Sequence, residues 1–153
     1  MRHKVICIQQ LHPEGMKILN SRPDLEIIVP ESVDHATWGN FLPSAEAIVV
    51  RLSKIPRDLI AAAPKLRLIS RHGVGCDNID VAAATEHGVV VATVGEANAP
   101  SVVEHTIALV FALAKRLPEF DRAVREGDYM RKMKLDAQDV AGRTILIIGL
   151  GRI

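Results

Sequence analysis

The chain has 153 residues, of which 48% are hydrophobic and 3% aromatic, and its formal net charge is +1 at pH 7. This hydrophobic content excludes a mainly disordered protein, and the length allows one domain with a core or one domain and part of another. The small net charge and scarce aromatic residues argue against nucleic-acid and anionic-membrane partners, which usually require a concentrated basic face.

The amino terminus and the cysteines bear on the compartment. The apolar run near the start is short and ends at Gln9, so it predicts a first strand and not a secretion signal. No apolar run approaches the roughly 18 residues of a membrane span. Cys7 and Cys76 lack metal-ligand spacing, and two free thiols are typical of a reducing cytoplasm. We therefore expect a cytoplasmic protein with no metal site.

Short apolar runs alternate with helical patterns along residues 5–94. Pro13 opens one helix, Ser32 can cap the next, Pro64 stops a third and Gly88 closes a fourth. The predicted strands are 5–8, 25–29, 45–50, 66–70 and 89–94, and the predicted helices are 13–19, 32–41, 56–63 and 79–87. This alternation predicts an α/β fold with a parallel five-stranded sheet covered on both faces, and ligands at the carboxyl ends of the strands.

The loop at residues 71–80 is the first candidate site. Gly73 and Gly75 follow the fourth strand and precede a helix start. Glycines remove Cβ atoms that would keep a ligand at a distance, and unpaired amides near a helix entrance favour negative charge. The loop is therefore a candidate site for a small anion.

A different pattern begins after Gly95. Ser101 and Glu104 have the spacing of a capping box and predict the start of a helix at 101–117. This helix is apolar on nearly every side from Thr106 to Ala114, so it requires a further domain or a partner chain to cover it. We expect a homodimer or a higher assembly through it. Pro118 starts a more polar helical segment that reaches about Tyr129.

The last stretch predicts a sixth strand at 144–148, followed by Gly149 and Gly151. A strand followed by Gly-x-Gly is the first part of a dinucleotide-binding fingerprint, whose third glycine, helix and acidic residue are absent here. A flexible carboxyl-terminal tail is the alternative, and the two interpretations are compatible.

Four stretches together resemble the D-isomer-specific 2-hydroxyacid dehydrogenases, especially the phosphoglycerate dehydrogenase-like members. They are 50–51, 71–80, 98–104 and 142–153, in family order and spacing. The resemblance implies a flavodoxin-like substrate domain at 1–98. It also implies that 99–153 is the truncated start of an NAD-binding Rossmann domain, whose first long helix forms the dimer contact.

The resemblance also implies site residues. The amides around Val74 and Gly75 would hold the substrate carboxylate, which agrees with the anion site inferred from the glycines. Arg51 would reach the far end of the substrate, where a phosphate can sit, and Asn98 would lie near the substrate between the domains. The implied substrate-binding set is Arg51, Ser53, Gly73, Val74, Gly75 and Asn98, and the implied cofactor-binding set is Val74, Gly149, Gly151, Arg152 and Ile153.

The catalytic arginine, glutamate and histidine of this family would lie beyond Ile153, so no catalytic residue is assigned. We expect this polypeptide alone to bind no NAD and to transfer no hydride, because a nicotinamide and a proton donor are both required. The expected function is the substrate-binding part of an NAD-dependent D-2-hydroxyacid dehydrogenase that acts on a small 2-hydroxy or 2-oxo acid. The choice between NAD and NADP stays open. The alternative is a non-catalytic module for binding a small acid or for dimerisation.

Two other protein classes share the five-strand alternation. A phospho-receiver needs acidic residues after the first strand and an aspartate after the third, where this chain has Gln9, Gln10 and Arg51. A flavodoxin needs a phosphate loop rich in serine, threonine and glycine after the first strand, and that loop is absent. The sequence argues against both classes.

Several residues of the 71–80 loop keep two interpretations. Arg71 either binds substrate or pairs with Asp77 or Asp80, and His72 either touches a ligand or is an ordinary loop residue. Asp77 and Asn78 are expected to bond loop amides and Asp80 to lie near the next helix start, because a cation site requires more oxygen ligands than this loop offers.

Overall fold

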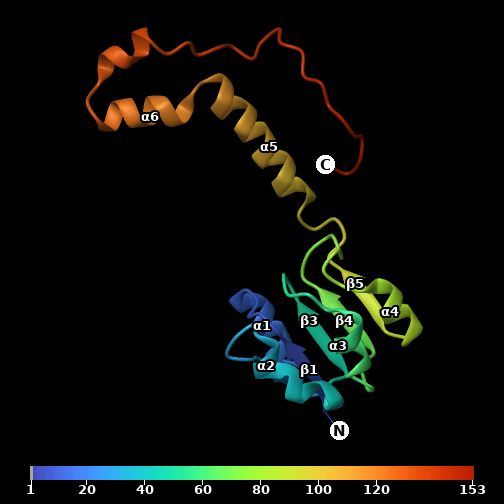
Figure 1. Ribbon diagram of the computed structural model, residues 1–153. Coiled ribbons are helices and arrows are strands. Elements are labelled where there is room, and N and C mark those ends of the chain that lie inside the picture. Colours follow the sequence, from blue (N-terminus) through green and yellow to red (C-terminus); the bar gives the residue numbers. More distant parts are fainter. Residues whose placement is uncertain (1) are drawn as a thin grey trace. The chain divides into compact units, whose positions relative to one another are not determined.

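The computed structural model describes residues 2–153. The chain divides into two compact units, one ending at Gly95 and the other running over Glu96–Ile153. Figure 1 shows the sheet and its helices in the first unit and the helices α5 and α6 in the second. We describe each unit by itself.

The first unit is a five-stranded parallel sheet with the strand order β2-β1-β3-β4-β5 (Figure 1). This is the order of flavodoxin-like doubly wound folds, so the fold class expected from the sequence is confirmed. The strands are β1 (His3–Cys7), β2 (Leu25–Ile28), β3 (Ala47–Val50), β4 (Leu68–Arg71) and β5 (Val90–Thr93). The helical segments are α1 (Pro13–Asn20), α2 (His35–Trp38), the 3-10 helix η1 (Gly39–Ser44), α3 (Arg57–Ala61) and α4 (Val81–Glu86).

One face of the sheet is well covered over its three central strands. The strand register places Ile6, Ile48 and Ile69 in one row, and all three are 0% exposed. They belong to one buried cluster with side chains of α2, η1, α3 and α4, including Trp38 and Leu42. The main core therefore lies between this face and those helices.

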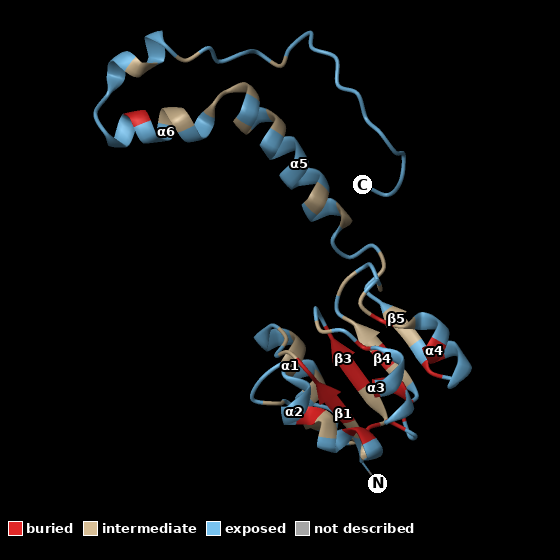
Figure 2. Ribbon diagram, in the orientation of Figure 1, coloured by how far each residue is buried: buried red, intermediate tan, exposed pale blue. Residues whose placement is uncertain are grey.

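The other face is covered only in part. Val5, Ala47, Leu68 and Val90 form its row, and exposure rises from 5% at Val5 to 61% at Val90. Its buried cluster is small, consisting of Val5, Cys7 and Val49, and the partly buried Met16 of α1 packs against it. The expectation that helices cover both faces is thus wrong along β4 and β5, because α1 packs only near β1 and β2 (Figure 2).

The segment predicted as one helix at 32–41 is instead two short ones. Asp34 caps α2, since its Oδ1 accepts the amide of Ala36 at 3.1 Å, while Ser32 Oγ accepts the amide of Asp34 at 3.1 Å. The predicted cap at Ser32 is therefore wrong. Pro43 lies within η1 and has no amide to donate, which suits the tighter, shorter helix better than a continuous α-helix.

The second unit contains α5 (Ala99–Ala114), α6 (Leu117–Arg125) and the 3-10 helix η2 (Tyr129–Met133). The predicted capping box is wrong, because Asn98 is the N-cap and Ser101 lies inside α5. Pro100 takes an early helical position, where its missing amide would have no partner in any case. The helix ends at Ala114 and not at 117, since Arg116 has φ 52° and separates α5 from α6.

The predicted sixth strand is also not formed. Residues 144–148 have no strand assignment, and Ile145 to Ile148 are 57–91% exposed. A strand requires a neighbour to pair its amides and carbonyls, and no described residue of the second unit forms a ladder with this segment. Within residues 2–153, no helix has the length and hydropathy needed to cross a membrane.

Candidate functional site

The candidate site lies at the carboxyl edge of the parallel sheet. All five strands run in the same direction, so the segments that follow them meet at one edge. Gln9 follows β1, Arg51 follows β3, residues 72–80 follow β4 and Val94 follows β5. These segments are joined to one another by hydrogen bonds.

The loop after β4 is attached at both ends and has unpaired amides in the middle. At its start, the amide of His72 donates to Val50 O at 2.8 Å and Gly73 O accepts the amide of Val94 at 3.1 Å; at its end, the amide of Asp80 donates to Ile55 O at 3.0 Å. In the described part of the chain, the amides of Val74 and Gly75 donate to no protein acceptor. Two adjacent unpaired donors in an exposed glycine loop are suited to a carboxylate.

Arg71 lies across this loop. A Cβ added to Gly73 would be 1.0 Å from Arg71 Nη1, so the glycine leaves room for the guanidinium. Nη1 donates to His72 O at 3.1 Å, while the buried Nε has no partner among residues 2–153. The structure therefore does not form the alternative pairs of Arg71 with Asp77 or Asp80.

The segment after β3 carries Arg51 and Ser53. Arg51 is exposed, and its amide donates to Gln9 Oε1 at 3.2 Å. Ser53 O accepts a hydrogen bond from Asn78 Nδ2 at 2.7 Å. Asn78 thus bonds a loop carbonyl, and the expectation that its side chain bonds loop amides is wrong.

Asp80 has a structural role at the end of the loop. Asp80 Oδ1 accepts the amide of Ala83 at 2.8 Å and caps α4, as expected from its place before that helix. Arg57 Nη2 donates to Glu86 Oε1 at 3.0 Å, and this bond holds the pKa of the Glu86 carboxyl below its usual value. The side chain of Asp77 makes no hydrogen bond within residues 2–153, so its predicted bonding to loop amides is wrong.

Asn98 and the carboxyl-terminal glycines belong to the second unit. Asn98 makes no capping hydrogen bond with its side chain. Gly149 has φ 97°, and a Cβ on Gly149 or Gly151 would meet open space. Arg152 Nε pairs with Glu96 Oε1 at 2.6 Å.

The second unit does not build a dinucleotide site by itself. The two glycines suit a close approach of a pyrophosphate, but such a site also requires a strand before them and a helix after them. Neither element is formed around Gly149 in the described residues. We therefore derive no cofactor chemistry from this unit.

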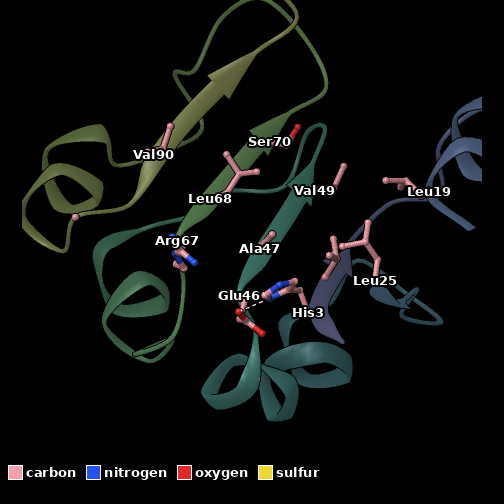
Figure 3. Close-up of a pocket in the computed structure, with 12 residues that line it drawn as sticks. His3, Leu19, Leu25, Glu46, Ala47, Val49, Arg67, Leu68, Ser70 and Val90 are labelled. Atoms are coloured by element: carbon pink, nitrogen blue, oxygen red, sulfur yellow. Dashed lines mark hydrogen bonds and ion pairs between the residues drawn. The ribbon is translucent and has the colours of Figure 1, made fainter. Parts of the chain in front are cut away.

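A separate groove on the first unit differs chemically from the carboxyl edge. A groove of about 630 Å³ lies on the partly covered sheet face, where Ala47, Leu68 and Val90 stand side by side across three strands (Figure 3). His3 Nδ1 and Glu46 Oε2 pair at its end, 2.7 Å apart, which lowers the pKa of Glu46. Its lining is mainly apolar and contains none of the predicted site residues, so the groove is not a candidate for the predicted anion site.

Comparison with known proteins identifies the family. The family model described as "D-isomer specific 2-hydroxyacid dehydrogenase, catalytic domain" matches residues 5–145. The chain belongs to this family, as the resemblance of its motifs implied.

Individual relatives give the same result. The chain is 38% identical over 98% of its length to the D-3-phosphoglycerate dehydrogenase of Archaeoglobus fulgidus. It is 32% identical over 99% of its length to the hydroxypyruvate reductase of Thermotoga maritima. Among solved structures, the NADPH-dependent glyoxylate/hydroxypyruvate reductase of Sinorhizobium meliloti in complex with citrate matches 99% of this chain with a TM-score of 0.85 and 27% identity.

The chain is much shorter than these relatives. It spans 28% of the Archaeoglobus enzyme, 49% of the Thermotoga enzyme and 48% of the Sinorhizobium enzyme. The family is therefore shown, while the activity and substrate of the whole protein are matters for proposal.

Proposed function

We propose that the first unit binds the carboxylate of a small 2-hydroxy or 2-oxo acid for an NAD(P)-dependent dehydrogenase. The observation that supports this most directly is the pair of unpartnered amides at Val74 and Gly75, in a loop attached at both ends. The space beside Gly73 is taken by the Arg71 guanidinium, which places a positive charge near these amides. A carboxylate that accepts hydrogen bonds from both amides would hold carbon 2 of the acid just outside the carboxyl edge of the sheet.

In this proposal, the two parts of the chain have different tasks. Residues 1–98 form the substrate domain, and residues 99–153 begin the domain that binds the nicotinamide cofactor. Asn98 contacts the substrate, while Val74, Gly149, Gly151, Arg152 and Ile153 contact the cofactor. The separation of the chain into two compact units after Gly95 is consistent with this proposal.

Arg51 and Ser53 bind the end of the substrate away from the carboxylate. Arg51 is exposed and has no ion-pair partner in the described part of the chain, so its guanidinium is available to a phosphate. The resemblance to D-3-phosphoglycerate dehydrogenases favours a phosphorylated acid. The hydroxypyruvate reductase relative makes an unphosphorylated acid the competing substrate.

Replacing one arginine tests this assignment. In Arg51→Ala, we expect the affinity for D-3-phosphoglycerate to fall about tenfold or more, because a charged hydrogen bond is lost. The affinity for D-glycerate, which has no phosphate, should change little. Both dissociation constants can be measured by titrating the ¹⁵N-labelled 153-residue chain and following the amide signals of Val74 and Gly75.

The matched control is Arg67→Ala. Arg67 is also exposed, but it precedes β4 and so lies at the opposite, amino edge of the sheet. Its loss removes the same charge without touching the proposed site, and binding should be unchanged. Equal losses in the two variants would show that only net charge matters. No binding of either acid to the unsubstituted chain would refute the carboxylate site itself.

We also propose that α5 mediates self-association, as a homodimer or a higher assembly. Ile107 is 52% exposed, Phe111 48% and Leu113 79%, which leaves an apolar helix uncovered within its own unit.

Both cysteines are free, which supports a cytoplasmic location. The net charge of +1 gives no support to nucleic-acid or membrane partners.

A further inference from the structure

The segment at residues 51–53 is held from both sides by side-chain amides. β3 lies between β1 and β4 in the sheet, so the loops after both neighbouring strands reach the segment that follows β3. Gln9 belongs to the loop after β1, and Asn78 belongs to the loop after β4. Neither residue is a member of the substrate-binding or cofactor-binding sets described above.

Gln9 binds the first half of the segment. Its Oε1 accepts the amide of Arg51 at 3.2 Å and the amide of Leu52 at 2.7 Å. Because two donors face a single atom, that atom must be the oxygen of the carboxamide. Leu52 is 68% exposed, so apolar packing of this side chain does not hold the segment in place.

Asn78 binds the second half. Its side-chain Nδ2 donates to Ser53 O at 2.7 Å, and its backbone carbonyl accepts a hydrogen bond from the amide of Ile55 at 2.8 Å. Ile55 is 0% exposed and anchored in the core. Asn78 therefore joins the segment that carries Arg51 to the loop that carries Val74 and Gly75.

We propose that Gln9 and Asn78 are positioning residues, which hold Arg51 at a fixed place relative to the Val74 and Gly75 amides. Neither side chain needs to touch the substrate. Each fixes the backbone from which Arg51 projects, so that one acid can reach the arginine and the amides together. This inference rests on the proposed function, because it requires that the amides and Arg51 bind the same ligand.

Two isosteric substitutions separate positioning from charge. Gln9→Glu adds a negative charge but keeps an acceptor for the Arg51 and Leu52 amides. Asn78→Asp adds the same charge but replaces the donor that faces Ser53 O with an acceptor, so the hydrogen bond is lost. Gln9→Leu removes the acceptor without adding charge.

Two measurements on the 153-residue chain test the proposal. The first is amide hydrogen exchange at Arg51 and Leu52, with the core amides of Ile48 and Ile69 as a control for folding. Exchange at Arg51 and Leu52 should be fast in Gln9→Leu and slow in Gln9→Glu. The second is the dissociation constant of D-3-phosphoglycerate, determined by the ¹⁵N titration described above.

We expect Gln9→Leu to bind D-3-phosphoglycerate about fivefold more weakly than the unsubstituted chain, as the loss of a typical hydrogen bond predicts. We expect Asn78→Asp to bind about fivefold more weakly than Gln9→Glu, although both carry the same added charge. Equal affinities within this isosteric pair would overturn the inference, and so would unaltered binding in Gln9→Leu. If the unsubstituted chain binds neither this acid nor D-glycerate, the proposed function fails and the inference fails with it. If the unsubstituted chain binds the acid and the variants bind it with the same affinity, only the inference is refuted.

Discussion

At the scale of single residues, the two cysteines have different environments. Cys7 is 0% exposed and its Sγ donates to Gln9 O at 3.2 Å, whereas Cys76 lies half-buried in the 71–80 loop. Burial raises the pKa of the Cys7 thiol above its usual value of 9.0. The folded protein therefore favours the neutral thiol, a preference that stabilises the fold below pH 9 and is lost as the pH rises through the raised pKa.

Alkylation should distinguish the two thiols. Iodoacetamide attacks the thiolate, so at pH 8 we expect Cys76 to react at least tenfold faster than Cys7 in the folded chain. Peptide mass spectrometry at successive times gives both rates, and in denaturant the two should become similar. Equal rates in the folded chain would contradict the buried position of Cys7.

The local residues of the candidate site illustrate what the sequence can predict. The glycine loop, Arg51 and the cap at Asp80 can be recognised from neighbouring residues along the chain. The placement of Arg71 over Gly73 and the hydrogen bonds of Gln9 and Asn78 cannot. Gln9 and Arg51 are 42 positions apart, and only the order of strands in the sheet brings them together.

At the scale of elements, α5 has the surface of a helix that lacks a partner. Its residues are predominantly apolar, yet none of them is buried. At about 25 cal/mol per Å² of apolar surface, leaving several large side chains in water costs several kcal/mol. Association of two or more chains would recover part of this free energy.

The oligomeric state tests this expectation. Light scattering at micromolar concentration should give a mass of a dimer or more, and Ile107→Glu should shift it toward the monomer by placing a charge on the apolar surface. Glu104→Gln, on the same helix, should leave the mass unchanged. A strictly monomeric unsubstituted chain would refute association through α5.

The element boundaries show where sequence patterns are insufficient. Strands and helices of the first unit occur in the predicted order, because alternating apolar runs and breakers specify them locally. The capping box at Ser101 and the strand at 144–148 fail for different reasons. Asn98 and Pro100 start α5 earlier than Ser101, and the apolar run at 144–148 has no neighbouring strand among the described residues.

At the scale of the whole molecule, the two units differ in completeness. The first has a sheet, a buried core and a carboxyl edge with aligned donors. The second has two helices, a 3-10 helix and an extended segment with Gly149 and Gly151. A polypeptide of these residues therefore contains the proposed acid site but lacks the strand and helix that a dinucleotide requires.

We accordingly expect the purified 153-residue chain to transfer no hydride by itself. NADH oxidation followed at 340 nm with glyoxylate, hydroxypyruvate and other 2-oxo acids should proceed at the rate of buffer. The ¹⁵N titration with D-3-phosphoglycerate shows on the same preparation whether the acid site is intact. This expectation would be contradicted if the unsubstituted chain oxidised NADH faster than buffer and the substitution Arg51→Ala abolished that activity.

Residue types at fixed spacing along the chain are enough to predict the parallel α/β fold, the glycine loop and the family. The folded arrangement was needed to learn which sheet face stays open and which side chains hold the segment that carries Arg51. The physical reason is that these features depend on the strand order β1-β3-β4 and on the packing of α1. Such contacts join residues far apart in the chain, and no local pattern encodes them.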